Sequence, residues 1–163
     1  MRQNGWSLVE IMVVVIVVGI LAAITWPAAS GLLNRATLTA TTTEFISAIH
    51  LARNSAVKHG DVSVLCPTSD GRVCDEDADY VDGWLVTTAT NDSEETLRSW
   101  PATRPTLQVN YPGDQFVRFG PDGLPRQSGG AFLAGTARFC LGGEGRRVIL
   151  SRNGRVRVVD DEC

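Results

Sequence analysis

Arginines crowd the last part of this chain, and together they could bind phosphate. Six of them fall within twenty residues: Arg138, Arg146, Arg147, Arg152, Arg155 and Arg157. Each guanidinium offers a planar fork of donors that pairs with two phosphate oxygens, and neutralised phosphates release condensed counterions. The opposing acids are mainly Glu144 and the cluster Asp160, Asp161 and Glu162. These residue types predict a salt-sensitive site for a polyanion.

The Asn153-Gly154 dipeptide predicts how three of these arginines are placed. Asn-Gly favours a two-residue type I′ turn between antiparallel strands, which would set Arg152 opposite Arg155. Alternation of side chains would then bring Arg157 to the same face. No aromatic side chain or recognition helix adjoins the three, so we expect contacts with the phosphate backbone of such a polyanion and no base readout.

The alternative is that these arginines are a solvated outer face of a strand. Lys58 is the only lysine in the chain, so arginine supplies almost all of its positive charge. The choice of arginine is therefore weak evidence for a phosphate site. The clustering of positive charge is the stronger evidence.

Short β-rich runs separated by turn residues must carry this cluster. They lie at Val62–Cys66, Trp84–Thr88, Leu107–Tyr111, Phe116–Phe119, Thr136–Leu141, Arg147–Ser151 and Arg155–Val159. No helical period lies between them, which favours antiparallel sheet over repeated strand–helix–strand units. The stretch Asp70–Glu95 is interpreted as an acidic, turn-rich excursion, with its acids on a face away from the arginines.

A long helix is predicted before the strands, in two halves. From Ile11 to Asn34 no side chain is charged, and such an apolar run can span a bilayer. Pro27 removes one helical hydrogen bond, so a kink or a locally melted turn is expected near it. The second half is amphipathic, with apolar residues at helical spacing: Leu38, Phe45, Ile49, Ala52 and Ala56.

Gly60 is predicted to end this helix, because glycine adopts the left-handed conformation that closes a last helical turn. The amphipathic half would then pack on the antiparallel sheet. The fold class is therefore α+β, with a membrane-spanning first half of the helix and an amphipathic second half.

Four cysteines, Cys66, Cys74, Cys140 and Cys163, follow the apolar segment. If that segment anchors an exported domain, the cysteines meet an oxidising compartment and two disulfides become plausible. Three pairings are possible. We favour Cys66–Cys74, which closes a short polar loop, and Cys140–Cys163, which tethers the C-terminal residue to an inner strand.

Other chemistry has little support in the sequence. His50 and His59 join no recognised catalytic spacing of Ser, Cys or Glu, so we expect neither catalytic residues nor a cofactor. The cysteine spacings fit no common zinc pattern. The acidic residues from Asp75 to Asp82 lack the glycine and final glutamate of an EF-hand loop, so a solubilising loop is preferred to a calcium site.

The N-terminus resembles the type IV prepilin motif, in the residues Gly5-Trp6-Ser7-Leu8-Val9-Glu10 followed by an unbroken apolar run. The resemblance implies that a prepilin peptidase cuts after Gly5 and methylates the new N-terminal Trp6. It also implies that Glu10 meets the N-terminal amine of a neighbouring subunit during fibre assembly. A carboxylate just inside an apolar segment is costly unless it gains a partner, which agrees with that role.

The alternative for the N-terminus is an ordinary signal anchor or a cleaved secretory signal with an interfacial glutamate. The apolar regions of secretory signals are shorter and lack an acidic residue at their start. The prepilin interpretation is therefore preferred.

Further residues resemble the FimT/GspH group of minor pilins and pseudopilins. They are the segment from Ala48 to Gly60, the run Phe119-Gly120-Pro121-Asp122-Gly123, and Gly154-Arg155-Val156-Arg157 near the C-terminus. The last element is similar to that of FimT pilins implicated in DNA capture for natural transformation. The resemblance implies other pilin subunits, the prepilin peptidase and double-stranded DNA as partners.

The expected organisation follows from both lines of reasoning. Residues 1–5 are a leader peptide, 6–27 a transmembrane and fibre-core helix, 28–60 its amphipathic continuation, and 61–163 a β-rich globular domain. The protein would reside in the bacterial inner membrane with a periplasmic domain, then in a pilus fibre at the cell surface. The alternative is a GspH-type pseudopilin of a type II secretion system that does not bind DNA.

Overall fold

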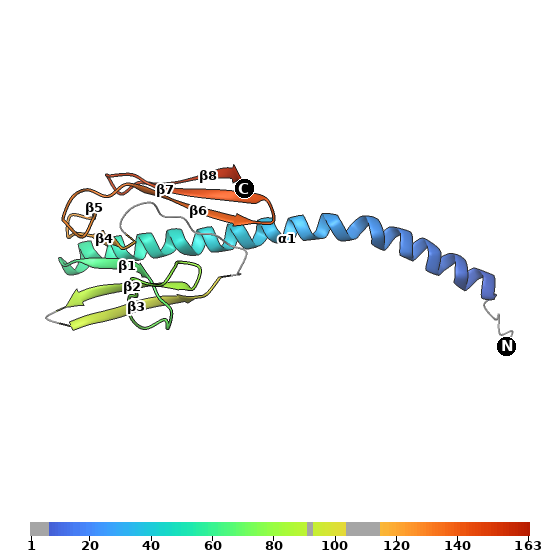
Figure 1. Ribbon diagram of the computed structural model, residues 1–163, viewed down its shortest axis with the longest axis horizontal. Coiled ribbons are helices and arrows are strands. Elements are labelled where there is room, and N and C mark those ends of the chain that lie inside the picture. Colours follow the sequence, from blue (N-terminus) through green and yellow to red (C-terminus); the bar gives the residue numbers. More distant parts are fainter. Residues whose placement is uncertain (1–6, 91–92, 104–114) are drawn as a thin grey trace.

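The computed structural model describes residues 7–90, 93–103 and 115–163 of the chain. Within these ranges, a single long helix, α1 (Leu8–His59), precedes eight strands. Figure 1 shows the N-terminal half of α1 projecting away from a head in which the helix lies beside two sheets. The α+β class expected from the sequence is confirmed.

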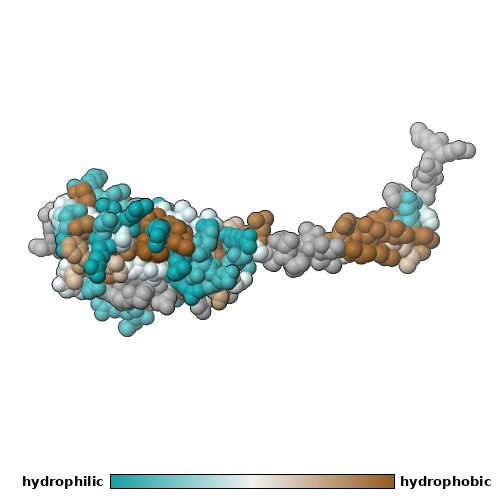
Figure 2. All heavy atoms as spheres, turned by 90° about the horizontal axis from the view of Figure 1, so that it is seen from above, coloured by the Kyte–Doolittle hydropathy of each residue, from teal (hydrophilic) through white to brown (hydrophobic). Residues whose placement is uncertain are grey.

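The first half of α1 is apolar and uncovered. Its large side chains from Leu8 to Leu21 are 47–76% exposed, and Figure 2 shows them as a hydrophobic band remote from the head. In the described part of the chain, no helix meets the length and hydropathy required to cross a membrane.

Pro27 does not interrupt α1, which continues as one helix from Leu8 to His59. The locally melted turn expected around Pro27 is therefore wrong. Proline removes a single hydrogen bond, and a long helix with intact bonds on both sides can bend through that position. The axis of α1 curves gently along its exposed half (Figure 1).

The second half of α1 buries the predicted stripe. Leu38, Phe45, Ile49, Ala52 and Ala56 are each at most 2% exposed, which confirms the amphipathic period. Gly60 ends the helix as predicted: it adopts φ 70°, and its N–H donates to the carbonyl of Ala56 at 3.0 Å.

Two antiparallel sheets form the head. The five-stranded sheet has the order β3-β2-β1-β4-β5, and the three-stranded sheet the order β6-β7-β8. The strands are β1 (Ser63–Pro67), β2 (Gly83–Thr90), β3 (Ser93–Pro101), β4 (Val117–Phe119), β5 (Pro125–Arg126), β6 (Gly135–Leu141), β7 (Glu144–Leu150) and β8 (Val156–Glu162).

Six of these strands overlap predicted runs, and two were not predicted. β3 begins inside the stretch interpreted as an acidic excursion, because its polar residues do not alternate with apolar ones as in a half-buried strand. β5 is too short to give a pattern. The predicted strand Leu107–Tyr111 lies outside the described residues.

Phe45 of α1 joins the helix to both sheets. Its ring makes edge contacts with Tyr80 and Trp84 on the side of the five-stranded sheet, at centroid distances of 5.5 and 5.7 Å. It contacts Phe139 of β6 in the three-stranded sheet at 5.3 Å. One core, centred on the buried face of α1, therefore fixes the position of both sheets.

Candidate functional site

The C-terminal hairpin joins β7 to β8, as predicted, but its turn is one residue longer than expected. The N–H of Ser151 donates to the carbonyl of Arg155 at 3.0 Å, and the N–H of Gly154 donates to the carbonyl of Ser151 at 2.8 Å. Arg152, Asn153 and Gly154 thus form a three-residue loop, closed by Gly154 at φ 74°.

The predicted pairing of Arg152 with Arg155 is therefore wrong, since Ser151 lies opposite Arg155. The physical reason lies in Asn153. Its side-chain oxygen accepts hydrogen bonds from the Ser151 hydroxyl and the Arg155 N–H, which favours the longer loop. A dipeptide rule does not include these local bonds.

Arg155 and Arg157 still share a face of the sheet. Arg157 pairs with Ile149 of β7, and the two arginines line a hollow of about 290 Å³ with Ile149 and Ser151. Arg152 lines a neighbouring hollow that also includes Ile149 and Ser151. The three arginines therefore flank one patch at the hairpin end of the three-stranded sheet.

Arg152, Arg155 and Arg157 are all exposed, and we call these three residues the hairpin arginines. Within the described ranges, none of the three has an acidic side chain within ion-pair distance. Their guanidinium groups are consequently available to an external anion.

The other predicted arginines are engaged within the protein. Arg138 of β6 and Arg147 of β7 both contact Asp161 Oδ2, at 2.8 and 3.2 Å from their Nε atoms. Arg146 lies on the opposite face and contacts Asp160 at 3.2 Å. The six arginines thus divide into three that are available and three that are paired.

The hairpin loop, which carries Arg152 and directly precedes Arg155, is fixed to α1 by Arg53. The Arg53 guanidinium donates to the carbonyl of Gly154 at 3.0 Å. A Cβ atom on Gly154 would lie only 3.1 Å from Arg53 Nη1, and one on Gly123 only 3.3 Å from Arg53 Nε. Three segments that are far apart in the sequence, around Arg53, Gly123 and Gly154, therefore meet at one point.

The sequence does not predict Arg53 as a positioning residue. It lies in the family-like segment from Ala48 to Gly60, but a helical arginine at an otherwise polar position gives no sign that it will contact a loop 101 residues away. The unusual feature is the pair of left-handed glycines that border it, and only the folded chain brings them together.

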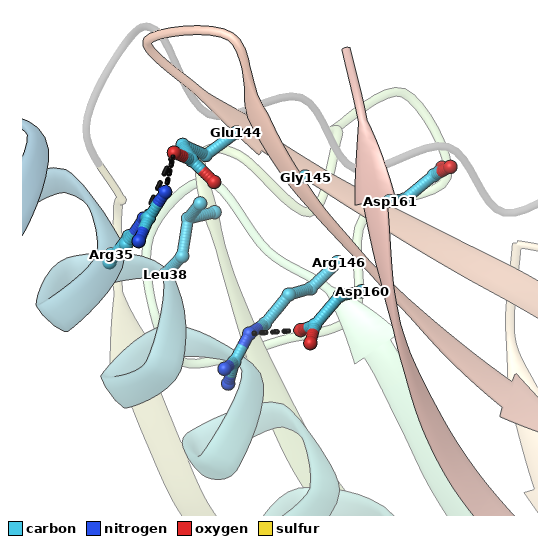
Figure 3. Close-up of a pocket in the computed structure, with 7 residues that line it drawn as sticks. All are labelled: Arg35, Leu38, Glu144, Gly145, Arg146, Asp160 and Asp161. Atoms are coloured by element: carbon cyan, nitrogen blue, oxygen red, sulfur yellow. Dashed lines mark hydrogen bonds and ion pairs between the residues drawn. The ribbon is translucent and has the colours of Figure 1, made fainter.

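A second contact between α1 and the three-stranded sheet lies at the opposite end of that sheet. A pocket of about 360 Å³ lies there, and Arg35 of α1 is 2.7 Å from Glu144 of β7 at its edge. Figure 3 shows this pair and the neighbouring pair of Arg146 and Asp160. Hydrogen bonding to Glu144 raises the pKa of Arg35 above its usual value. These charges satisfy one another, so we assign the pocket a structural role.

Both disulfides have the pairing favoured from the sequence. Cys66 is bonded to Cys74 with a Cα–Cα distance of 5.5 Å, and Cys140 to Cys163 with 5.9 Å. The second bond passes over Gly145 of β7, where a Cβ atom would lie 2.6 Å from Cys163 Sγ. It thus ties the end of β8 to β6 across the central strand.

The acidic loop between β1 and β2 belongs to the five-stranded sheet. Asp70 accepts bonds from the N–H groups of Arg72 and Val73, and these bonds lower its pKa below the usual value. A bond from the Ser69 hydroxyl and one from the Asp77 N–H do the same for Asp75. Among described residues, no three His, Cys, Asp or Glu side chains are grouped to hold a metal.

The N-terminal sites are only partly visible. Gly5 and Trp6 lie outside the described residues. Glu10 is exposed in the first turn of α1, where its N–H donates to the carbonyl of Ser7 at 3.0 Å. A carboxylate at a helix N-terminus is stabilised by the helix dipole.

Comparison with solved structures identifies the fold. Two crystal forms of the type IV minor pilin FimU from Pseudomonas aeruginosa superpose with TM-scores of 0.59 and 0.57, at 19% and 18% identity. They cover 77% and 75% of this chain, and 90% and 92% of their own. Among curated proteins, no match is found.

Two family descriptions match the sequence itself. Residues 1–26 match the prokaryotic N-terminal methylation motif, and residues 41–154 match the type II transport protein GspH. With the fold, these matches make the protein a minor pilin or pseudopilin with a prepilin-type N-terminus. The chain therefore belongs to the GspH family.

Proposed function

We propose that this protein is a minor type IV pilin that binds double-stranded DNA through the hairpin arginines Arg152, Arg155 and Arg157, for DNA uptake in natural transformation. The observation that carries the proposal is that these three exposed guanidinium groups have no ion-pair partner among the described residues, although the neighbouring arginines do. Unpaired arginines on a fixed turn suit a ligand of regularly spaced phosphates.

The geometry favours contacts with the DNA backbone. The hollows beside the hairpin arginines are lined by Ile149, Ser151 and Asn153, and neither contains an aromatic side chain on which a base could stack. The surface is formed by β7, β8 and their loop, and the described chain has no helix there that could enter a DNA groove. Binding is expected to be independent of sequence and weak for one subunit.

The loop requires no ordering when it binds. Arg53 donates a hydrogen bond to the carbonyl of Gly154. The Asn153 side chain accepts bonds from Ser151 and Arg155, the residues on either side of the loop. Side chains on a preformed hairpin lose less conformational entropy on binding than those on a flexible tail. This favours a binding role over that of a solvated strand face.

Binding of the full chain, held in a nonionic detergent, to a DNA duplex across a salt series tests the proposal. The logarithm of the binding constant falls as the logarithm of the salt concentration rises. Replacing Arg155 and Arg157 with Ala should make this fall shallower by up to about 1.8, since each lost phosphate contact contributes about 0.9 to the slope. The matched control is Arg72→Ala with Arg98→Ala, two exposed arginines on the side of the other sheet.

Two outcomes would contradict DNA binding by this surface. One is no binding of the unaltered chain even at low salt, and the other is an equal loss of affinity in the control variant. Absence of binding would favour the second candidate function, a GspH-type pseudopilin of a type II secretion system. That candidate is supported by the family match over residues 41–154.

The proposed role also includes processing, anchoring and assembly. A prepilin peptidase would cut after Gly5 and methylate Trp6, and residues 6–27 would anchor the protein in the inner membrane before it enters the fibre with other pilin subunits. The match to the methylation motif over residues 1–26 supports this sequence of events. So do the exposed apolar side chains of α1, which need lipid or neighbouring helices to cover them.

Glu10 is proposed to pair with the N-terminal amine of a neighbouring subunit. Glu10→Ala should leave membrane insertion and processing intact but strongly reduce incorporation into fibres, because the buried amine loses its counter-ion. Membrane fractionation and recovery of sheared fibres measure the two steps. Glu44→Ala, which removes an exposed carboxylate from the other half of α1, is the control, and wild-type incorporation of the Glu10 variant would disprove the role.

A further inference from the structure

Asp161 occupies two arginines that would otherwise extend the basic face. Arg138, Arg147 and Asp161 come from β6, β7 and β8, and the register of the three strands brings them to one face of the sheet. A single carboxylate oxygen, Asp161 Oδ2, lies 2.8 Å from Arg138 Nε and 3.2 Å from Arg147 Nε. The Asp161 side chain is 19% exposed, whereas those of the arginines are 45% and 44% exposed.

This face is continuous with that of the hairpin arginines. Arg147 and Ile149 are two residues apart on β7, and Ile149 pairs with Arg157. Side chains two residues apart on a strand point to the same side. One outer face of the three-stranded sheet therefore carries available arginines at its hairpin end and paired arginines at its disulfide end.

The position of Asp161 is fixed from both sides. The Cys140–Cys163 disulfide begins two residues later and crosses Gly145, and the N–H of Cys163 donates to the carbonyl of Gly143 at 3.2 Å. Arg138 also donates to the carbonyl of Glu162. The acidic end of β8 is thus held over Arg138 and Arg147 and cannot swing away without breaking these bonds.

We propose that Asp161 is an internal competitor for phosphate that confines polyanion binding to the hairpin end of the three-stranded sheet. The inference rests on the proposed function and names the residue that limits its site. A phosphate at Arg138 or Arg147 must compete with a carboxylate that already forms an ion pair with both, whereas one at Arg155 or Arg157 displaces only water and counterions. Asp161 therefore sets how many phosphates one subunit neutralises.

The first test is Asp161→Asn in the full chain in nonionic detergent. The variant should bind a DNA duplex with a salt slope steeper by up to about 1.8, since two released arginines each add about 0.9. Near 0.1 M salt this corresponds to a gain in affinity of roughly ten- to sixtyfold. Glu95→Gln, which removes an exposed carboxylate from β3, controls for the change in net charge.

A triple variant assigns the gain to the two arginines. Asp161→Asn combined with Arg138→Ala and Arg147→Ala should return the salt slope to that of the unaltered chain. An equal slope for the Asp161→Asn and Glu95→Gln variants would overturn the inference while leaving the proposed function in place. Failure of both the unaltered chain and the Asp161→Asn variant to bind DNA would overturn both.

A second test needs no substitution and so does not depend on the variant folding. Phenylglyoxal modifies accessible arginines, and mass spectrometry locates each modified residue. DNA should protect Arg152, Arg155 and Arg157 of the unaltered chain but leave the slow reaction of Arg138 and Arg147 unchanged. Equal protection of Arg138 and Arg147 would show that phosphate reaches them despite Asp161, and would overturn the inference.

Discussion

The two sheets of the head each contain a disulfide and a loop with a left-handed glycine, but these features connect different parts of the structure. Each has one disulfide, and each has a loop closed by a left-handed glycine, Gly71 in one and Gly154 in the other. Cys66–Cys74 closes a surface loop whose acids bond to their own backbone. Cys140–Cys163 instead joins strands, and the loop at Gly154 is fastened to α1.

This difference indicates that the three-stranded sheet depends more than the acidic loop on the exact positions of its residues. The side-chain bonds of Asp70 and Asp75 stay within the acidic loop, and single bonds such as that from the Thr96 hydroxyl to the Arg72 carbonyl join it to the sheet. The three-stranded sheet is held at both ends, by Arg35 and Arg53 of α1, and its outer face carries the arginines of the proposed site. We therefore expect equivalent changes to cost more in the three-stranded sheet than in the acidic loop.

Removing each disulfide should give the largest effects and a clear ranking. The bridged residues are 23 apart for Cys140–Cys163 and 8 apart for Cys66–Cys74. Restriction of the unfolded chain predicts losses of about 3.4 and about 2.5 kcal/mol in the free energy of unfolding. Replacing only the outer partner, in Cys163→Ala and Cys74→Ala, leaves the buried Cys66 side chain in place.

Urea unfolding of the full chain in nonionic detergent measures this ranking, with the buried Trp84 and Trp100 as fluorescent reporters. Mass analysis without reductant confirms that the other bridge stays intact. A larger loss in Cys74→Ala than in Cys163→Ala would break the comparison, because the acidic loop would then be the more important brace.

The sequence predicted the helix and most strands better than the contacts that join them. The buried stripe from Leu38 to Ala56 and the end of α1 at Gly60 follow from local periodicity and local backbone preference. β3 does not, because its first four residues are polar and its apolar Leu97 and Trp100 do not alternate at strand spacing; it gains its strand partners from β2.

The candidate site shows the same division. Positive charge near the C-terminus is visible in the sequence, and so is the hairpin. Which arginines are paired is not visible, because the contacts of Asp161 with Arg138 and Arg147 depend on the register of three strands. A shift of one residue in β8 would turn Asp161 to the opposite face.

Gly71 and Gly154, one left-handed glycine from each of the two loops, offer the smallest and most local test of the comparison. Alanine at Gly71 or Gly154 must adopt a φ near +73°, which costs about 1–2 kcal/mol relative to glycine. At Gly71 the nearest atom to the added Cβ is the Ser99 hydroxyl oxygen at 3.8 Å, an ordinary contact. Gly71→Ala should therefore show the conformational cost alone.

Gly154→Ala should cost about 1 kcal/mol more, because it adds crowding to the same conformational strain. Its Cβ would lie 3.1 Å from Arg53 Nη1 and 3.2 Å from the carbonyl oxygen of Gly123, so the Arg53–Gly154 bond must lengthen or the loop must shift. Urea midpoints of the two variants measure the difference, and Gly154→Ala in an Arg53→Ala background isolates the part due to Arg53. Equal losses at Gly71 and Gly154 would mean that Arg53 yields freely and does not fix the loop, so the hairpin arginines would have no preformed support from α1.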